Sequence, residues 1–170
     1  MELTAGGIFL DFSIRKLELS LSRIRDCVSK LTAEQIWIRH GDHQNAVGNL
    51  ILHLSGNVRQ WIVSGVGGQP DTRVRDQEFD ARGDLSAPEL MARLEGTVNE
   101  AVGILKELDP GRLVEMYQPQ KNRVPILEGI YASVEHFAQH TAQIIFITKL
   151  LSGEDMGFYK HLNKQRTSPK

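Results

Sequence analysis

The amino-acid sequence predicts an all-α protein built as a four-helix bundle. Four separate stretches repeat apolar residues at alternating spacings of three and four, which places them on one face of an α-helix. No stretch shows a convincing strand pattern of alternating apolar and polar residues. Four amphipathic helices can bury their apolar stripes against one another, which is the packing principle of a four-helix bundle.

The first two helices are expected over residues 10–31 and 47–61. The first stripe consists of Leu10, Ile14, Leu17, Leu21, Ile24, Val28 and Leu31. The second stripe consists of Val47, Ile51, Leu54, Val58 and Trp61. Asn45 is expected to cap the start of the second helix, and the glycines from Gly65 onward are expected to end it.

The third and fourth helices are expected over residues 90–108 and 130–151. Their stripes consist of Leu90, Leu94, Thr97, Ala101, Ile104 and Leu108, and of Ile130, Val134, Phe137, Thr141, Ile144, Thr148 and Leu151. Ser86 and Glu89 have capping-box spacing before the third helix, and Gly153 follows the fourth. A short extra turn is expected after Thr32, and a small hairpin within residues 113–127.

The connection between the second and third helices predicts the order in which the helices run. About twenty extended residues can span up to about 66 Å, whereas a twenty-residue helix is about 30 Å long. Residues 66–85 can therefore run along the whole bundle, which allows the second and third helices to be parallel neighbours. Because this crossover is polar and rich in Arg and Asp, we expect it at the surface.

Composition excludes several classes of function. The chain has 170 residues, a net charge of −1 and 41% hydrophobic residues, which is typical of one globular domain and not of a nucleic-acid-binding protein. It contains no apolar run of about 18 residues, so no membrane span is expected. A single cysteine, Cys27, fits a reducing compartment, and we expect a cytoplasmic protein. Cys27 lies off the first apolar stripe and is expected at the surface or in an interface.

Three of the six histidines lie at comparable places on two predicted helices. His136 and His140 are four residues apart, so they are neighbours on one helical face and could bind one metal ion together. Both lie at the edge of the apolar stripe of the fourth helix, and His53 lies at the edge of the second stripe. If these helices are neighbours, the three imidazoles converge. Alternatively, each is an ordinary core histidine bonded to a carbonyl or carboxylate group.

Other metal and catalytic motifs do not fit the sequence. A zincin requires Glu after the first histidine of the pair, where this chain has Phe137, and Glu135 points about 100° away from His136. Di-iron bundles require Glu three residues before a histidine, which no histidine here has. The sequence also has no Walker loop, Gly-x-Gly-x-x-Gly or Gly-x-Ser-x-Gly motif.

Two segments resemble the signatures of the DinB/YfiT-like metalloprotein superfamily. "NAVGNLILHLSGNVRQW" is similar to its second-helix signature, and "VEHFAQHTAQI" is similar to its fourth-helix His-x-x-x-His signature. The resemblance covers residues 5–152 and is greatest with an uncharacterised bacterial subgroup. It implies an up-down-down-up bundle, with a divalent metal, usually zinc or nickel, held by His53, His136 and His140. It also implies a homodimer and, by analogy with characterised relatives, chemistry that depends on a small thiol.

The predicted function is that of a metal-dependent enzyme acting on a small-molecule substrate. Three neutral imidazoles leave a divalent metal with an open coordination position, which is typical of catalytic zinc sites. The resemblance points to a thiol-dependent S-transferase; a hydrolase and a non-catalytic metal-binding or dimerisation bundle remain alternatives. Asn57, Gln60 and Gln143 point toward the ligand face and are either supporting contacts of the site or ordinary polar residues at a groove rim. No obvious carboxylate base is found on that face.

The domain organisation is expected to be simple. One DinB-like domain should cover residues 1–155, and residues 156–170 should form a C-terminal tail. The basic end of this tail, "NKQRTSPK", is expected to be frayed.

Overall fold

The computed structural model describes residues 3–41, 43–121 and 123–160, and it is mostly helical. Four long helical segments carry most of the chain: α1 (Ala5–Val28), α3 (Val47–Val58) with its π-helical continuation η1 (Arg59–Ser64), α5 (Ala87–Glu107) and α6 (Ile126–Ser152). Shorter elements lie between them: α2 (Ala33–Ile36), α4 (Arg75–Asp80), the 3-10 turn η2 (Pro110–Val114) and the strands β1 (Met116–Tyr117) and β2 (Val124–Pro125). The prediction of an all-α protein is confirmed.

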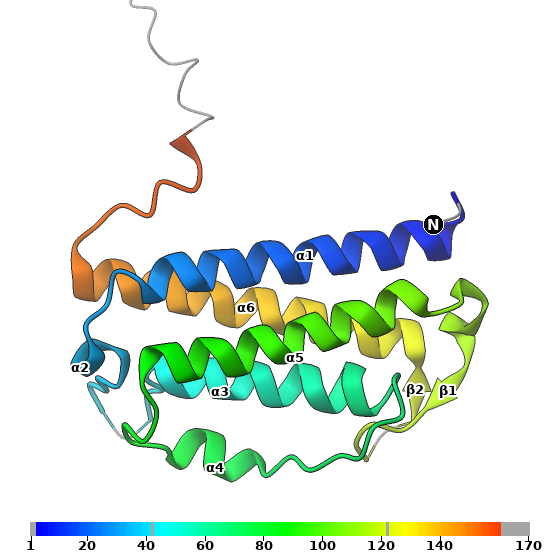
Figure 1. The fold of residues 1–170 in the computed structure, drawn as a ribbon, viewed down its shortest axis with the longest axis horizontal. Coiled ribbons are helices and arrows are strands. Elements are labelled where there is room, and N and C mark those ends of the chain that lie inside the picture. Colours follow the sequence, from blue (N-terminus) through cyan, green and yellow to red (C-terminus); the bar gives the residue numbers. More distant parts are fainter. Residues whose placement is uncertain (1–2, 42, 122, 161–170) are drawn as a thin grey trace, which may run out of the picture.

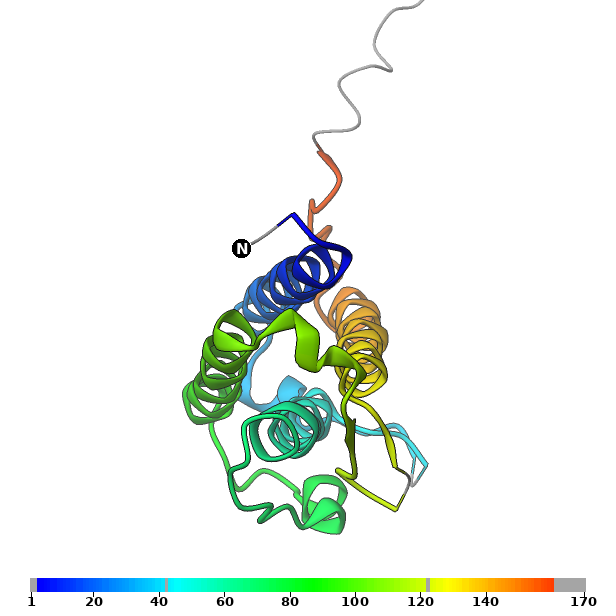
Figure 2. The same cartoon turned by 90° about the vertical axis from the view of Figure 1, so that its right-hand side faces the viewer.

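The long helices pack in a ring around one core. α1 packs against α5 and α6, and α3 packs against the same two helices. The end-on view shows this order around the core (Figure 2). Figure 1 shows that α3 and α5 run in one direction, whereas α1 and α6 run in the other. This arrangement makes α3 and α6 neighbours, and these are the two helices that carry the predicted histidine ligands.

The core contains most of the residues in the predicted stripes. Leu10, Leu17 and Ile24 of α1 are fully buried, and so are Leu54 of α3 and Ile144 of α6. All of these side chains belong to a single hydrophobic cluster, which also includes residues of α5. Burial of apolar surface at this scale is the main force that stabilises the helices, because most helical stability in proteins comes from tertiary packing of an amphipathic face.

The start of α3 differs from the prediction. Asn45 is not its cap: the helix begins after Ala46, whose N–H group donates a 3.1 Å hydrogen bond to the side-chain oxygen of Asn49. The Asn49 side-chain amide donates to the carbonyl groups of Glu78 and Ala81, both at 3.0 Å. The buried Asn49 side chain therefore caps the start of α3 and also connects α3 to the neighbouring α4 by hydrogen bonds.

The burial of Cys27 contradicts the expectation of a surface position. Its side chain is fully buried, and this burial raises the pKa of the thiol. Ser13, Ser20 and Cys27 recur every seven residues, and all three are buried beside the apolar stripe of α1. Because α1 packs against two helices, its buried face is wider than one stripe, and small side chains allow a close approach on the additional side.

The crossover between α3 and α5 was expected at the surface, and this is wrong for its central part. α4 packs against α3 (Figure 1), and the side chains of Arg73 and Glu78 are only 5% and 9% exposed. The predicted hairpin is present as antiparallel β1 and β2, in which Tyr117 pairs with Val124. The predicted turn after Thr32 is also present as α2, with its capping box.

The C-terminal segment of the described chain lies against the bundle. Gly153 ends α6 in the left-handed conformation, with φ of 70°, and Met156 and Phe158 pack against the core. The basic end predicted to be frayed lies outside the described residues, as does His161. Within the described residues, every helix is too short or too polar to cross a membrane.

Candidate metal centre

His53, His136 and His140 converge between α3 and α6. Each offers one ring nitrogen, and these three atoms lie within 4.8 Å of one another, an arrangement that could hold a metal ion. The Nε2 atoms of His53 and His136 are 2.8 Å apart, and the rings of His136 and His140 are 4.4 Å apart between centroids. The described residues contain two further histidines, His40 and His43, and both are exposed in the loop before α3.

Glu78 of α4 fixes the orientation of the His53 ring. Its Oε2 atom lies 2.9 Å from Nδ1 of His53, and both side chains are buried. A carboxylate accepts hydrogen bonds only, so Nδ1 of His53 carries the hydrogen and Nε2 is left with a free lone pair. Carboxylate–histidine pairs of this kind hold the ligand histidines of many metal sites in the required tautomer.

Arg73 holds the Glu78 carboxylate from its other side. Its Nε donates to Oε1 of Glu78 at 2.7 Å, and its Nη2 donates to Oε2 at 2.9 Å. Burial alone would raise the pKa of Glu78, but the hydrogen bonds and charges of Arg73 and His53 outweigh it and lower the pKa below its usual value. Glu78 is therefore ionised at neutral pH, as the acceptor role toward His53 requires.

Gly56 provides the space that this carboxylate needs. A Cβ atom at position 56 would overlap Oε1 of Glu78 and would lie 2.8 Å from its Cδ and 2.9 Å from Nε of Arg73. Position 56 is about one turn after His53 on α3. Because Gly56 has no side chain, the Glu78 carboxylate can lie directly against the helix backbone at this point and reach His53. No larger residue fits there unless the carboxylate moves.

The three predicted polar residues have different places around the site. Gln143 accepts a 2.7 Å hydrogen bond from Nδ1 of His140 through Oε1, so it sets the tautomer of that ring. Asn57 lies in the wall of the cavity beside His53 and accepts a hydrogen bond from Ser133. Gln60 accepts a hydrogen bond from Arg73 and donates one to Asp71, so it supports the crossover; its hydrogen bonds within the described chain do not go to the histidines.

A cavity of about 360 Å³ opens beside His53 and His136. Trp61 of the π-helical turn η1 forms part of its wall, and π-helical turns are frequent at functional sites. Glu135 also lines this cavity, although helical geometry alone placed it away from the ligands. No obvious carboxylate base was expected on the ligand face, but the structure places two carboxylates near the site: Glu78 behind His53 and Glu135 in the cavity wall.

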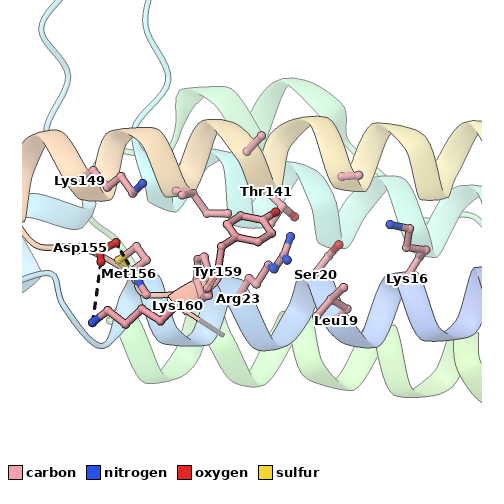
Figure 3. A pocket seen from close by; sticks show the side chains of 15 residues that line it. Lys16, Leu19, Ser20, Arg23, Thr141, Lys149, Asp155, Met156, Tyr159 and Lys160 are labelled. Atoms are coloured by element: carbon pink, nitrogen blue, oxygen red, sulfur yellow. Dashed lines mark hydrogen bonds and ion pairs between the residues drawn. The ribbon is translucent and has the colours of Figure 1, made fainter. Parts of the chain in front are cut away.

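A separate groove lies between α1 and α6. It has a volume of about 350 Å³ and is lined by Lys16, Arg23, Lys149 and Tyr159, among others (Figure 3). None of the three clustered histidines lines it. This groove therefore has no part in the histidine site.

Protonation of His136 is expected to destabilise the metal-free protein in acid. Burial, together with the positive charge of neighbouring histidines and arginines, lowers its pKa from 6.5 to about 4. As pH falls from 6.5 to about 4, the unfolded chain gains a proton here that the folded chain excludes, so the free energy of unfolding decreases, by at most about 3 kcal/mol. Above about pH 6.5 the ring is neutral in both the folded and the unfolded chain, so its protonation no longer changes the free energy of unfolding. Urea unfolding in EDTA across this range would measure the decrease, and an unchanged pH dependence in His136→Gln would contradict it.

Comparison with known proteins identifies the family. A family profile described as "Protein of unknown function (DUF1572)" matches residues 5–163. The chain belongs to the DUF1572 family. Comparison with curated proteins gives no match. A solved structure, described as that of a conserved protein from Enterococcus faecalis, is similar to this DUF1572 protein with a TM-score of 0.70 and 14% identity, over 91% of this chain and 99% of that one. At this identity the likeness shows the fold alone, and the resemblance to DinB/YfiT-like proteins stays a prediction.

Proposed function

We propose that this DUF1572 protein is an enzyme that depends on a divalent metal, zinc or nickel, held by His53, His136 and His140. The observation that carries the proposal is the convergence of three ring nitrogens within 4.8 Å. In two of the rings, those of His53 and His140, the other nitrogen, Nδ1, already donates a hydrogen bond to an acceptor side chain. Glu78 and Gln143 keep the Nδ1 hydrogens of His53 and His140, so both Nε2 atoms are available as ligands. The proposed fold is the four-helix bundle that the DinB-like resemblance implies.

The protonation states of the ligands also suit a metal. A histidine binds a metal in its neutral form, through the ring nitrogen that carries no hydrogen, and burial lowers the pKa of both His136 and His140 below the usual value. Two of the three rings are therefore neutral at pH 7 before any metal arrives. No carboxylate belongs to the ligand cluster, so the full charge of the ion would act on a substrate.

The cavity beside the cluster favours a catalytic site over a structural one. Structural zinc sites are closed by four protein ligands, whereas three protein ligands leave one position for water or substrate. A divalent ion bound in this way lowers the pKa of a coordinated water or thiol toward neutrality. Glu78 and Gln143 hold the ligand rings, while Trp61 and Asn57 limit the space for the substrate.

The reaction we propose is the transfer of a low-molecular-weight thiol to an electrophilic small molecule. This choice rests on the resemblance to thiol-dependent DinB-like enzymes, as do the proposals of a homodimer and, with the single cysteine, of a cytoplasmic location. Glu135 supports a second candidate, a hydrolase, because a carboxylate in the cavity wall could act as a general base for water. A non-catalytic metal-binding or dimerisation bundle is the third possibility.

Metal analysis followed by an activity screen tests the proposal. The purified protein should contain about one zinc or nickel per chain and should conjugate a small thiol with a chromogenic electrophile. EDTA should remove both the metal and the activity. Hydrolysis of an ester or amide without thiol conjugation would favour the hydrolase, and loss of that hydrolysis in Glu135→Gln would assign the base. If the protein binds metal but shows neither activity, the non-catalytic metal-binding bundle would be the remaining interpretation.

A further inference from the structure

The wall of the metal cavity carries two arginines from the crossover, Arg73 and Arg75. A second hollow of about 620 Å³ shares Trp61, Arg73, Arg75 and Gln120 with it and adds Lys121 to the lining. The shared residues make the two hollows adjoining parts of one depression. A substrate that reaches the histidines from this side therefore passes between cationic side chains.

The two arginines have different surroundings. Arg73 is buried, and its charge is balanced by Glu78. Arg75 is exposed, and in the described part of the chain it forms no ion pair. The carboxylates in the walls of the depression are Glu135 and Asp71, and Asp71 already accepts hydrogen bonds from Gln60 and from the backbone of Arg73. The guanidinium group of Arg75 is thus free to bind an anion from outside the chain.

A cation–π contact with Phe79 places Arg75 close to the site. Its guanidinium carbon lies 4.7 Å from the centroid of the Phe79 ring, and that centroid lies 4.8 Å from the centroid of the His53 ring. Stacking on an aromatic face engages the plane of a guanidinium group and leaves its N–H edges available.

We propose that the substrate, or the thiol that acts with it, carries a carboxylate or phosphate group that binds Arg75 while its reacting end lies at the histidine cluster. This inference rests on the proposed function. The planar N–H fork of arginine matches the paired oxygens of either oxyanion, and Trp61 offers an apolar wall for the part of the molecule between its two ends. The preferred ligand is therefore a small anionic molecule with an apolar or aromatic middle.

Titration calorimetry on the zinc-loaded protein tests this inference with two thiols of similar size. 3-Mercaptopropionate carries a carboxylate and 2-mercaptoethanol carries none. Arg75→Gln should weaken binding of 3-mercaptopropionate at least about tenfold, because the variant loses the charge-assisted hydrogen bonds between the guanidinium group and the carboxylate. Binding of 2-mercaptoethanol should change less than about twofold. A third probe, 2-mercaptoethylphosphonate, shows which oxyanion Arg75 prefers.

Arg59→Gln is the matched control. Arg59 lies on η1, is bonded to Glu100 and does not line the depression, so the same change of charge there should leave all three affinities unchanged. An equal loss for both thiols in Arg75→Gln, or no loss for 3-mercaptopropionate, would overturn the anion site while leaving the metal site intact. Failure of the wild-type protein to take up either zinc or nickel would instead refute the proposed function and this inference with it.

Discussion

Replacing His140 with alanine should remove both the bound metal and any activity that depends on it. The variant loses one of three proposed ligands, and two ligands hold a divalent ion poorly. Removal of a residue that merely supports a ligand typically costs 10–100-fold in metal affinity, so loss of the ligand itself should cost at least about 100-fold. Elemental analysis after dialysis against a weak chelator measures the effect, together with the thiol-conjugation rate.

The fold of the His140→Ala variant should remain intact. His140 is partly exposed at the edge of the core, whereas its neighbours Phe137 and Ile144 are buried within it. The hydrophobic cluster extends over all four long helices and does not depend on the ion, unlike the core of a zinc finger. Helical circular dichroism should therefore match that of the wild-type protein, both in this variant and after EDTA treatment.

His43→Ala is the appropriate control for this experiment. It removes an exposed histidine from the loop before α3, outside the cluster. Metal content and activity should stay at the wild-type level. Retention of a full equivalent of metal in His140→Ala, or cooperative unfolding of the wild-type protein on chelation, would show that the site differs from the one proposed here.

The parts of the site that lie on regular helices could be predicted from the sequence. Helical periodicity places His136 and His140 on one face, and it places His53 at the edge of another apolar stripe, because these relations depend only on local geometry. The long crossover made α3 and α5 candidates for parallel neighbours. Local periodicity does not show which helices are neighbours in the bundle. Only the structure shows that α3 packs beside α6, so that the edges carrying the histidines face each other.

The supporting groups could not be predicted in the same way. Glu78 and Arg73 lie in an irregular crossover whose path is fixed by contacts such as that of Asn49 with the carbonyl groups of α4. Periodicity carries no information about such a segment, and its polar composition suggested a solvated surface. Gly56 was the available signal, because a glycine one turn after a candidate ligand on a helix can mark a close approach of another group. The surface position expected for Cys27 was wrong because a single apolar stripe describes the contact of α1 with one helix, whereas α1 packs against both α5 and α6.

Replacing Glu78 should produce the largest loss of stability among the residues around the site. In Glu78→Ala the buried guanidinium of Arg73 loses its only carboxylate partner among the described residues, and Nδ1 of His53 loses its acceptor. Removal of one partner from a buried ion pair typically costs about 3–5 kcal/mol. Urea unfolding should therefore show a decrease of about 3 kcal/mol in the free energy of unfolding. Glu100→Ala, which breaks the exposed pair with Arg59, should cost no more than about 1 kcal/mol.

Two further variants separate the stability of the fold from the orientation of His53. Glu78→Gln keeps an acceptor for Nδ1 of His53 but removes the charge, so metal affinity should fall about tenfold, at the lower end of the range for supporting groups. Gly56→Ala leaves the Glu78 carboxylate chemically unchanged but displaces it, because the new Cβ would overlap Oε1. If Glu78 acts by positioning His53, Gly56→Ala should lower zinc affinity by a similar factor, and the double variant should be little weaker than either single one. Wild-type zinc affinity in both single variants would show that Glu78 stabilises the fold without orienting the ligand.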